Sequence, residues 1–463
     1  MEISKDLQRA VLIMVLLNAF STSLMLSAAN VALPTIAADL SLDAVALSWV
    51  PMAYLMASAM FVLVFGKLAD TWGRKRFFLI GTVAVIVTSI AAAFSVNATM
   101  LLSARFLQGV SAAMLYATQI ALVSSVYPAQ RRGKVIGQVV SAIYIGLAAG
   151  PLLGGYAIDL LGWRASFLLQ VPLAVVVLML GVLKVKGEWS AETRTGFDVP
   201  GAIIYGLAIL LFCLGISRLP AVDGFILIAA SAAAISVFLR HARRTPFPIW
   251  DVNLFFSNRA FTLSCAASLI MYSTTYGNVV LLSLYLQYLK GMSASAAGMI
   301  MMLQPITMAI LSPLTGRLSD RIEPRILASL GMFITAVGLL MLAMLSSSSS
   351  LLRVALALLM TGLGFSLFSS PNVNAIMGSV AQKHYGSASA AVATTRLLGQ
   401  LSSIVLVTLA LTLVMGNRPI SPENYPQLEQ SIRLSFSIAA ALCIPGILLS
   451  LLRGRIHTAN NAI

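Results

Sequence analysis

The segment GKLADTWGRKR at residues 66–76 returns in altered form as GRLSDRIEPR at residues 316–325. Each copy follows a long apolar run and precedes another. This placement predicts a short charged hairpin between two hydrophobic helices. Because the chain contains the hairpin twice, we expect it to consist of two related halves.

The composition is typical of an integral membrane protein. Of the 463 residues, 59% are hydrophobic and 10% are charged, which is more apolar surface than a soluble core of this size can bury. Apolar stretches of about 20 residues recur along the chain, and this length fits a membrane-crossing helix, whereas barrel strands are about half as long. The sequence therefore predicts an all-α integral membrane protein.

Hydropathy predicts fourteen spans, and this even number places both termini on the same side. The first apolar stretch, residues 11–33, is too long for a signal peptide and is followed by many others, so we interpret it as a retained span. The spans are expected at residues 11–35, 46–67, 77–97, 100–127, 135–157, 164–185, 199–217, 222–240, 258–288, 294–316, 326–346, 351–378, 386–415 and 432–452.

The basic residues are distributed unevenly between the two sides. With the N-terminus inside, 22 Lys and Arg residues lie on the inner side and six on the outer side. This bias follows the positive-inside rule and predicts that both termini are cytoplasmic. The formal charge of +15 thus orients the chain and requires no nucleic-acid partner. The six outer residues are Arg164, Arg218, Lys290, Arg353, Arg418 and Arg433.

The spacing of the two hairpins indicates an insertion. They begin at residues 66 and 316, which is 250 residues apart, whereas two adjoining six-helix halves would place them roughly 200 apart. Spans seven and eight account for the difference. We therefore expect a six-helix bundle at residues 1–190, two inserted helices with linkers at residues 191–256, and a second six-helix bundle at residues 257–463. Such repeats usually meet around a substrate path near the bilayer midplane.

Four segments in order along the chain carry a resemblance to a known family. They are NVALPTIA at residues 30–37, the hairpin GKLADTWGRKR, RFLQGVSAA at residues 105–113 and GLAAGPLLGG at residues 146–155. Together they are similar to the major facilitator superfamily (MFS), in particular to its fourteen-helix drug:proton antiporter group. The resemblance implies a proton-coupled multidrug exporter, a multi-pass monomer of the bacterial inner membrane. Its partners would be a small-molecule substrate, protons and the lipid bilayer, with no cofactor and no metal.

The first hairpin is expected to act as a conformational latch. Gly66 and Gly73 permit the tight turn, and Asp70 can pair with Arg74 four residues later. The resemblance implies that Asp70 also faces the start of span thirteen at residues 386–387, where a carboxylate is favoured by the helix dipole. Because only one arrangement of the halves allows this contact, it would stabilise the outward-open state. The alternative is a basic loop that serves topology alone.

The second hairpin keeps Gly316 and Asp320 of this pattern. Glu323 and Pro324 replace the glycine and the arginine of the first copy. Asp320 is therefore expected to belong to a weaker latch. We expect the two halves to share their helical framework but to differ in function.

Span five contains a series of small residues around a proline. Glycines four positions apart let helices approach closely, and the proline favours a bend. The resemblance implies that this pattern is typical of exchangers, in which a closely packed, bent helix seals the path. A general helix-packing face is the alternative. The residues are Gly146, Gly150, Pro151, Gly154 and Gly155.

Two arginines are expected inside the membrane. Arg105 lies within span four, where an unpaired charge costs at least about 2.5 kcal/mol. The resemblance implies a role for Arg105 in proton movement. Arg396 in span thirteen matches no motif, and it either contacts substrate or reaches toward the inner surface or a backbone carbonyl.

No acidic residue is expected near the middle of a span. The resemblance implies an aspartate five residues before Asn30, but that position holds Met25. Asp159, at the outer end of span five, comes nearest to an embedded carboxylate, and Arg164 offers it a pairing partner. A buried carboxylate is the simplest device for exchanging a lipophilic cation for a proton. Its absence predicts neutral or anionic amphipathic substrates.

The remaining polar residues within the spans are candidates to line the substrate path, although each could instead form an interhelical hydrogen bond. A dedicated carrier for one metabolite or organic anion is the alternative function. No catalytic motif is present, and the three histidines lie in different loops, so we do not expect an enzyme. The substrate-path candidates are Asn30, Tyr54, Gln119, Tyr276, Asn278, Gln304, Asn374, Arg396 and Gln400.

Overall fold

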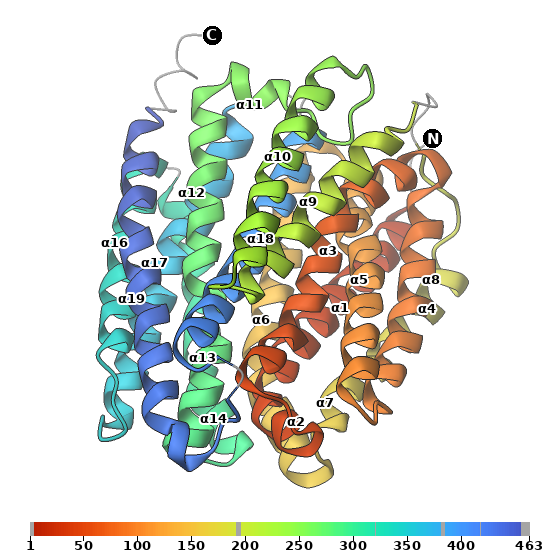
Figure 1. Cartoon of the computed structure of the whole chain (residues 1–463). Coiled ribbons are helices and arrows are strands. Elements are labelled where there is room, and N and C mark those ends of the chain that lie inside the picture. Colours follow the sequence, from red (N-terminus) through yellow and green to blue (C-terminus); the bar gives the residue numbers. More distant parts are fainter. Residues whose placement is uncertain (1–3, 191–195, 320, 381–384, 417, 455–463) are drawn as a thin grey trace.

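Fourteen helical segments of the described chain are long and apolar enough to cross a membrane, which confirms the predicted all-α membrane fold. The structure is a computed structural model that describes residues 4–190, 196–319, 321–380, 385–416 and 418–454 (Figure 1). The N- and C-terminal ends lie at the same end of the molecule. The excess of basic residues identifies that end as cytoplasmic.

The N-terminal half comprises six spans, two of which are interrupted. Span one breaks at Ala32, with Pro34 in the first turn of the short helix that follows. Span six is divided near Leu169. The helices are α1 (Lys5–Val31), α2 (Leu33–Leu40), α3 (Ala44–Trp72), α4 (Arg74–Ala93), α5 (Ala98–Val126), α6 (Ala129–Leu161), α7 (Arg164–Leu168) and α8 (Gln170–Leu183).

The C-terminal half again comprises six spans, preceded by the inserted pair and a short helix. Several helices begin earlier than hydropathy predicts, because their first turns are polar and extend beyond the bilayer core. The inserted helices are α9 (Val199–Ser217) and α10 (Val222–Arg244), followed by α11 (Asn253–Ser257). The C-terminal helices are α12 (Arg259–Thr275), α13 (Asn278–Leu284), the π-helical η1 (Tyr285–Leu289), α14 (Ala294–Met301), α15 (Leu303–Leu318), α16 (Pro324–Ala343), α17 (Leu351–Gly378), α18 (Tyr385–Val414), η3 (Pro422–Asn424) and α19 (Tyr425–Leu452).

The inserted pair lies beside the seam between the halves. Helix α9 contacts both α3 of the N-terminal half and α18 of the C-terminal half. The Tyr205 hydroxyl donates to the Ala59 carbonyl of α3 at 3.2 Å. Helix α10 packs on α9, where Ser231 donates to the Ala208 carbonyl at 2.7 Å, and most of its own surface stays exposed. The exact boundaries of the three predicted regions stay a prediction.

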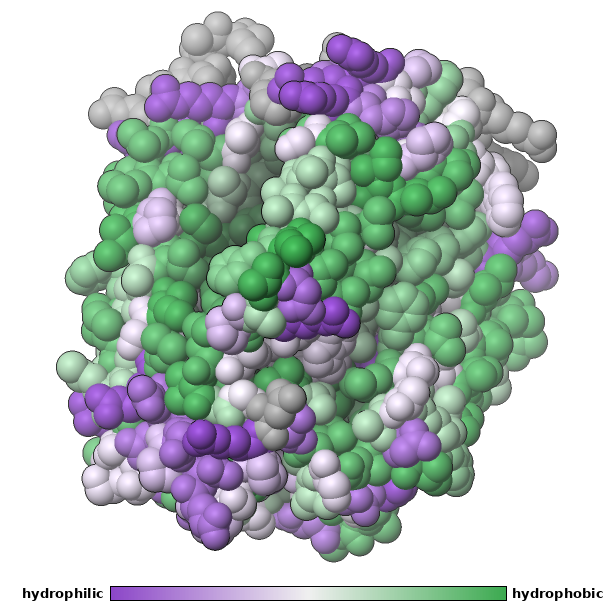
Figure 2. Space-filling model, in the orientation of Figure 1, coloured by the Kyte–Doolittle hydropathy of each residue, from purple (hydrophilic) through white to green (hydrophobic). Residues whose placement is uncertain are grey.

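Large apolar side chains cover the outside of the molecule. Leu160, Ile310 and Ile444 are each more than half exposed, as expected for side chains that face lipid. Figure 2 shows a broad hydrophobic belt, with hydrophilic side chains gathered mainly at the two ends. This surface agrees with a chain that crosses the membrane from one polar face to the other.

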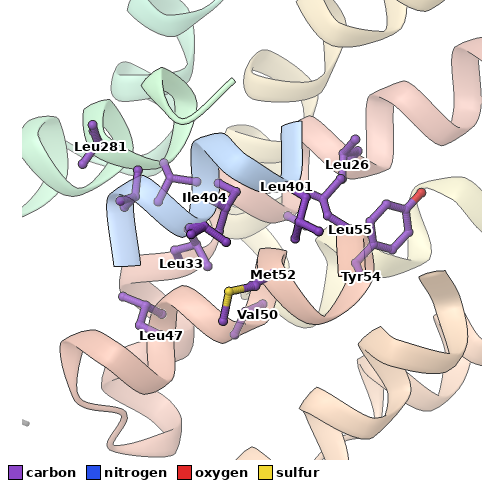
Figure 3. Packing of buried hydrophobic residues seen from close by; sticks show 14 of the residues in the cluster. Leu26, Leu33, Leu47, Val50, Met52, Tyr54, Leu55, Leu281, Leu401 and Ile404 are labelled. Atoms are coloured by element: carbon purple, nitrogen blue, oxygen red, sulfur yellow. The ribbon is translucent and has the colours of Figure 1, made fainter. Parts of the chain in front are cut away.

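Apolar packing joins the two halves along α3 and α18. Figure 3 shows Leu401 and Ile404 of α18 close to Val50 and Met52 of α3. All four side chains are almost fully buried. Toward the outer end, the Thr408 hydroxyl of α18 donates to Ser48 of α3 at 2.9 Å.

The outer ends of the halves are also joined by a carboxylate at a helix N-terminus. Asp159 of α6 accepts from the backbone N–H groups of Ala294 at 3.2 Å and Ser295 at 3.0 Å, at the start of α14. The expected pairing of Asp159 with Arg164 is wrong. Arg164, the first residue of α7, instead binds Asp39 of α2 at 2.9 Å, within the N-terminal half.

The break between α1 and α2 forms a second outer contact. The Val31 carbonyl at this break accepts from Gln287 of the π-helical turn at 2.9 Å and from Ser283 at 3.3 Å. The Tyr288 hydroxyl donates to the Pro34 carbonyl at 3.1 Å. A π-helical turn changes the direction in which successive side chains point. Here it directs Gln287 and Tyr288 of span nine toward the interrupted backbone of span one. These contacts join the outer ends of the two halves.

Asp159→Ala is expected to favour opening of the outer side. The substitution removes the acceptor for two N–H groups and a favourable helix-dipole interaction. The lost stabilisation is about 1 kcal/mol, which corresponds to roughly a fivefold change in the open-to-closed ratio. The measurement is alkylation by a membrane-impermeant thiol reagent of a cysteine at Ala297, which is buried in α14. The three native cysteines, all buried, are replaced first.

Asp39→Ala is the matched control for this experiment. Asp39 is also an outer carboxylate, but its partners, Trp163 and Arg164, belong to the same half. We expect it to leave the alkylation rate unchanged. Equal rates in both variants would contradict a latch between the halves.

Candidate functional site

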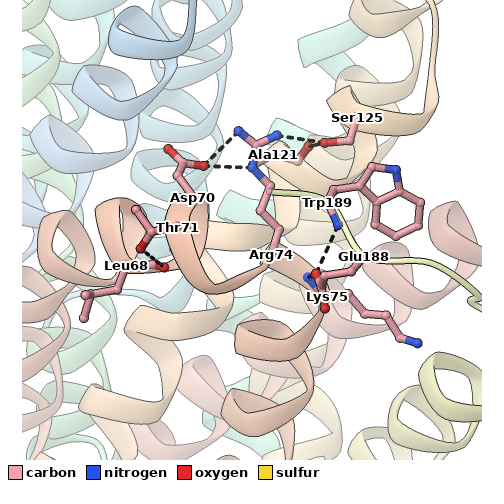
Figure 4. Close-up of polar contacts among 9 residues, drawn as sticks. All are labelled: Leu68, Asp70, Thr71, Arg74, Lys75, Ala121, Ser125, Glu188 and Trp189. Carbon is pink, nitrogen blue, oxygen red and sulfur yellow. Dashed lines mark hydrogen bonds and ion pairs between the residues drawn. The ribbon is translucent and has the colours of Figure 1, made fainter. Parts of the chain in front are cut away.

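The cytoplasmic hairpin between α3 and α4 contains the predicted ion pair (Figure 4). Arg74 binds Oδ1 of Asp70 through both Nε and Nη2, each at 2.8 Å. The remaining nitrogen, Nη1, donates to Ser125 of α5 at 2.8 Å. Both charged side chains are partly exposed, so this pair is worth no more than about 1 kcal/mol and mainly fixes the geometry of the turn.

A carboxylate from the linker to the inserted helices caps the start of α4. Glu188 accepts from the N–H groups of Lys75 at 2.8 Å and Arg76 at 3.1 Å, while the N–H of Arg74 donates to the Trp189 carbonyl at 2.8 Å. Sequence analysis missed Glu188, because its only signal is a carboxylate more than a hundred residues from the helix it caps.

Gly73 is required at this turn for two reasons. Its φ is +110°, which side chains rarely adopt, and a Cβ here would lie 2.5 Å from the Glu188 carboxyl carbon. Gly66, in contrast, has no atom within 4 Å of the corresponding position. The expected contact of Asp70 with residues 386–387 and the role of Asp320 lie outside the described side chains and stay predictions.

The glycine series of α6 forms two close contacts at once. Added Cβ atoms would lie 2.4 Å from the Phe20 carbonyl at Gly146, 2.6 Å from Ser27 at Gly150, and 2.6 Å from Ala28 at Gly154, so this face packs directly on α1.

The other face of α6 meets α14 in the opposite half. An added Cβ at Gly155 would lie 2.5 Å from the Ala294 carbonyl, and one at Gly298 would lie 2.0 Å from the Pro151 carbonyl. The five residues of the predicted antiporter motif therefore hold α6 between a neighbour in its own half and one across the interface. Their role in sealing the path stays a prediction.

Arg105 of α5 is fully buried and has no carboxylate partner in the described chain. Its Nε donates to the Val50 carbonyl at 3.0 Å, and its Nη1 donates to Gln108 at 2.6 Å. Gln108 in turn donates to Ser89 at 2.9 Å. The Nη2 nitrogen has no hydrogen-bond partner among the described residues. These acceptors fix the guanidinium in one position but leave its charge uncompensated.

Met25 occupies the place where a carboxylate would compensate this charge. Its sulfur lies 3.6 Å from Nη1 of Arg105 and is only a weak acceptor. The rings of Tyr54 and Phe167 lie 4.6 Å and 5.6 Å from the guanidinium carbon. Cation–π attraction to these rings offsets part of the desolvation of the arginine. Sequence analysis identified Met25 as a departure but could not predict Phe167.

Two predicted polar residues bond other polar side chains within the spans. The hydroxyl of Tyr54 lies 2.9 Å from the hydroxyl of Tyr116, which belongs to the interior of α5. Gln119 accepts from Asn18 of α1 at 3.3 Å. Tyr116 is therefore a further candidate, and its phenol at mid-helix was the available signal.

Other predicted residues are also buried but have fewer hydrogen-bond partners among the described residues. Asn30, Gln304 and Gln400 are each more than nine-tenths buried. The hydroxyl of Tyr276 is buried next to Asn30 without a hydrogen bond of normal geometry. These groups are polar, neutral and buried.

The structure places two predicted residues away from this group. Asn278 lines a cavity of about 10 Å³ between helices of the C-terminal half, which is about the size of one water molecule. Asn374 is exposed near the cytoplasmic end of α17, where it donates to Ser319 at 2.7 Å. Their part in a substrate path stays a prediction.

Arg396 of α18 differs from Arg105 in having little that holds it. It is partly exposed, and its one direct contact among the described polar and aromatic groups is the ring of Tyr272, 5.9 Å from the guanidinium carbon. It lies on α18, the helix of the C-terminal half that packs on α3 of the N-terminal half. The arrangement thus combines a fixed cation, a free cation and several neutral hydroxyls.

Comparison with known proteins assigns the family. The sequence profile of the Major Facilitator Superfamily matches residues 15–404 and 264–460. The chain belongs to the Major Facilitator Superfamily. It is an MFS transporter with multidrug efflux proteins among its relatives.

Curated relatives match along most of their length. The riboflavin transporter RibZ of Clostridioides difficile is 29% identical over 95% of this chain and 96% of its own. The uncharacterized transporter YebQ of Escherichia coli is 32% identical over 83% of this chain and 84% of its own. The multidrug resistance protein Stp of Mycobacterium tuberculosis is 30% identical over 87% of this chain and 75% of its own.

A solved structure shares the fold at low sequence identity. The peptide transporter POT, crystallised as a point mutant in complex with alafosfalin, has a TM-score of 0.70 over 97% of this chain and 95% of its own, at 15% identity. This likeness shows the MFS fold and carries no information about the substrate.

Gly73→Ala is expected to destabilise the cytoplasmic hairpin. The substitution forces an L side chain into a positive φ and against Glu188, at a cost of about 1–2 kcal/mol. Thermal unfolding of the purified protein measures the effect as a lower Tm. Gly66→Ala is the control, because it adds a methyl group inside α3 with open space around it and should leave Tm equal or slightly higher. Equal losses in both variants would contradict the role assigned to Glu188.

Proposed function

We propose that this MFS transporter is a proton-coupled exporter of neutral or anionic amphipathic small molecules in the bacterial inner membrane. The observation that carries the proposal is the buried guanidinium of Arg105, which meets Met25 in place of a carboxylate. A lipophilic cation entering this centre would add a second positive charge to an uncompensated one. A neutral molecule avoids that cost, and an anion relieves it.

The positions of the carboxylates support the same conclusion. Every acidic residue that the structure describes lies in a loop or at the end of a helix. Asp70 and Glu188 bind groups of the cytoplasmic hairpin, and Asp159 binds the outer end of α14. None of these three is placed to receive a cation at the middle of the membrane.

Alternating access is the mechanism that the contacts between halves favour. The outer ends are closed by Asp159 on α14 and by Gln287 on Val31, and rotation of one half against the other would break both contacts. The latch proposed at Asp70 would act at the opposite end. Closing one end while opening the other exposes a central site to one side at a time.

Proton coupling is the part of the proposal that rests on the family. The resemblance assigns proton movement to Arg105, and the described network places this arginine beside Gln108 and the Tyr54–Tyr116 hydroxyl pair. A monomer suffices, because the proposed path is formed by the two halves of one chain.

A dedicated carrier for one metabolite is the second candidate. It is favoured by RibZ, a riboflavin transporter by name, which matches nearly the full length of this chain. The relative Stp, a multidrug resistance protein by name, favours broad export instead. Flux measurements with a panel of substrates separate the two, since a dedicated carrier moves one compound and its close analogues.

Met25→Asp is expected to invert the charge preference of transport. A carboxylate beside Arg105 would neutralise the guanidinium and supply a group that exchanges a proton for a cation. In proteoliposomes with a proton gradient, the wild type should move anionic or neutral amphiphiles at least about tenfold faster than ethidium, and the variant should reduce that ratio by about tenfold or more.

Met25→Leu serves as the control because it keeps the volume and adds no charge. It should retain the wild-type preference, and the Tm of both variants shows whether each is folded. Strong proton-driven ethidium export by the wild type, with no flux of anions or neutral amphiphiles, would overturn the proposed substrate class.

A further inference from the structure

We infer that Arg396 and an aromatic wall of Tyr272, Phe365 and Tyr144 bind a planar aromatic anion between the two halves. The inference rests on the proposed function, because it names the substrate class and the site within that transporter. It also assigns different roles to Arg105 and Arg396. Arg105 sets the charge of the centre, and Arg396 contacts the ligand.

The surroundings of the two guanidinium groups differ in the property that ligand binding requires. Arg105 is fully buried, bonded to Val50 and Gln108, and enclosed by two rings. It cannot turn toward a ligand without breaking those contacts. Arg396 is partly exposed, and among the described polar and aromatic groups it contacts the ring of Tyr272, 5.9 Å from the guanidinium carbon. Its planar fork of donors is free to take a carboxylate in a bidentate pair.

The aromatic wall continues from the ring that Arg396 already touches. Tyr272 of α12 meets Phe365 of α17 edge to face, with ring centroids 5.3 Å apart. Phe365 meets Tyr144 of α6 in the same way at 6.5 Å. The wall therefore crosses from the C-terminal half to the N-terminal half. Tyr144 is fixed by Ser369 of α17, whose hydroxyl lies 2.8 Å from its own.

This combination of groups selects both charge and shape. A planar aromatic ring can stack or pack edge-on against tyrosine and phenylalanine, an arrangement that an aliphatic ring reproduces poorly. A carboxylate on that ring would reach Arg396 and replace the weak cation–π contact with charge-assisted hydrogen bonds. The Tyr116 hydroxyl is already paired with that of Tyr54, so the hydroxyl proposed as a further donor is that of Tyr276. The Tyr276 hydroxyl has no hydrogen bond of normal geometry to any described group.

The position of the wall also couples the ligand to the transport cycle. Tyr144 belongs to the N-terminal half, whereas Arg396, Tyr272 and Phe365 belong to the C-terminal half. A ligand that touches both halves binds one arrangement of them more tightly than the other. Such differential binding is what allows a ligand to shift a conformational equilibrium.

The test uses three small probes that separate charge from aromaticity. These are 2-naphthoate, its uncharged methyl ester, and cyclohexanecarboxylate. Dissociation constants are measured with the purified full-length protein by ligand-dependent thermal stabilisation. The wild type is expected to bind 2-naphthoate at least tenfold more tightly than either of the other two. Failure of all three to bind, or equal binding of acid and ester, overturns the inference.

The variants assign the preference to particular side chains. Arg396→Gln should remove the preference for acid over ester and leave ester binding unchanged. Arg396→Lys keeps the charge but not the planar fork, and should retain only part of the preference. Tyr272→Leu should remove the preference for naphthoate over cyclohexanecarboxylate. Arg353→Gln, in the first turn of α17 at its outer end, is the control and should behave as wild type.

Flux in proteoliposomes separates failure of this site from failure of the proposed function. If the Arg396→Gln variant exports neutral and anionic amphiphiles as fast as the wild type, the assignment of Arg396 is overturned and the proposed function is kept. Absence of any such export by the wild type, with selective naphthoate binding intact, would overturn the function and keep the site. Loss of 2-naphthoate export in Arg396→Gln, with ester export retained, would support both.

Discussion

The uncompensated charge of Arg105 is the constraint on which the centre of this transporter depends. A guanidinium cannot remain in a low-dielectric interior unless acceptors and rings surround it, and Val50, Gln108 and Tyr54 supply them. This enclosure makes Arg105 part of the framework and leaves its charge to act at a distance. The field of a fixed cation then decides which ligands can enter, and it leaves direct contact to a less constrained neighbour.

Close backbone approach is what brings the two halves to this centre. Helix α6 packs on α1 through Gly146, Gly150 and Gly154, and on α14 through Gly155 and the facing Gly298. The first contact lies within one half and persists if the halves rock as rigid bodies. The second lies between halves and must separate whenever the outer side opens. One helix therefore carries both a permanent face and a reversible one, and Asp159 at its outer end belongs to the reversible face.

Local features of this chain could be predicted from the sequence, whereas contacts between distant side chains could not. Hydropathy predicts the spans and the burial of Arg105. The ion pair of Asp70 and Arg74 follows from their spacing of four residues. The partner of Asp159 could not be predicted, since Arg164 is nearer in sequence but α14 is nearer in space. The cap that Glu188 forms on α4 was missed for the same reason.

The sequence by itself determined the membrane-spanning helices, their orientation, the repeat of the halves and the absence of a carboxylate from the middle of any span. Each of these depends on composition, charge asymmetry or spacing along the chain. Only the tertiary structure decided that Met25 contacts Arg105 and that Arg396 is partly exposed while Arg105 is enclosed. It also placed Asn374 on the exposed end of a helix, away from the centre. The physical reason is that the sequence shows which side chains are embedded, whereas their partners depend on which helices touch and which way each one is turned.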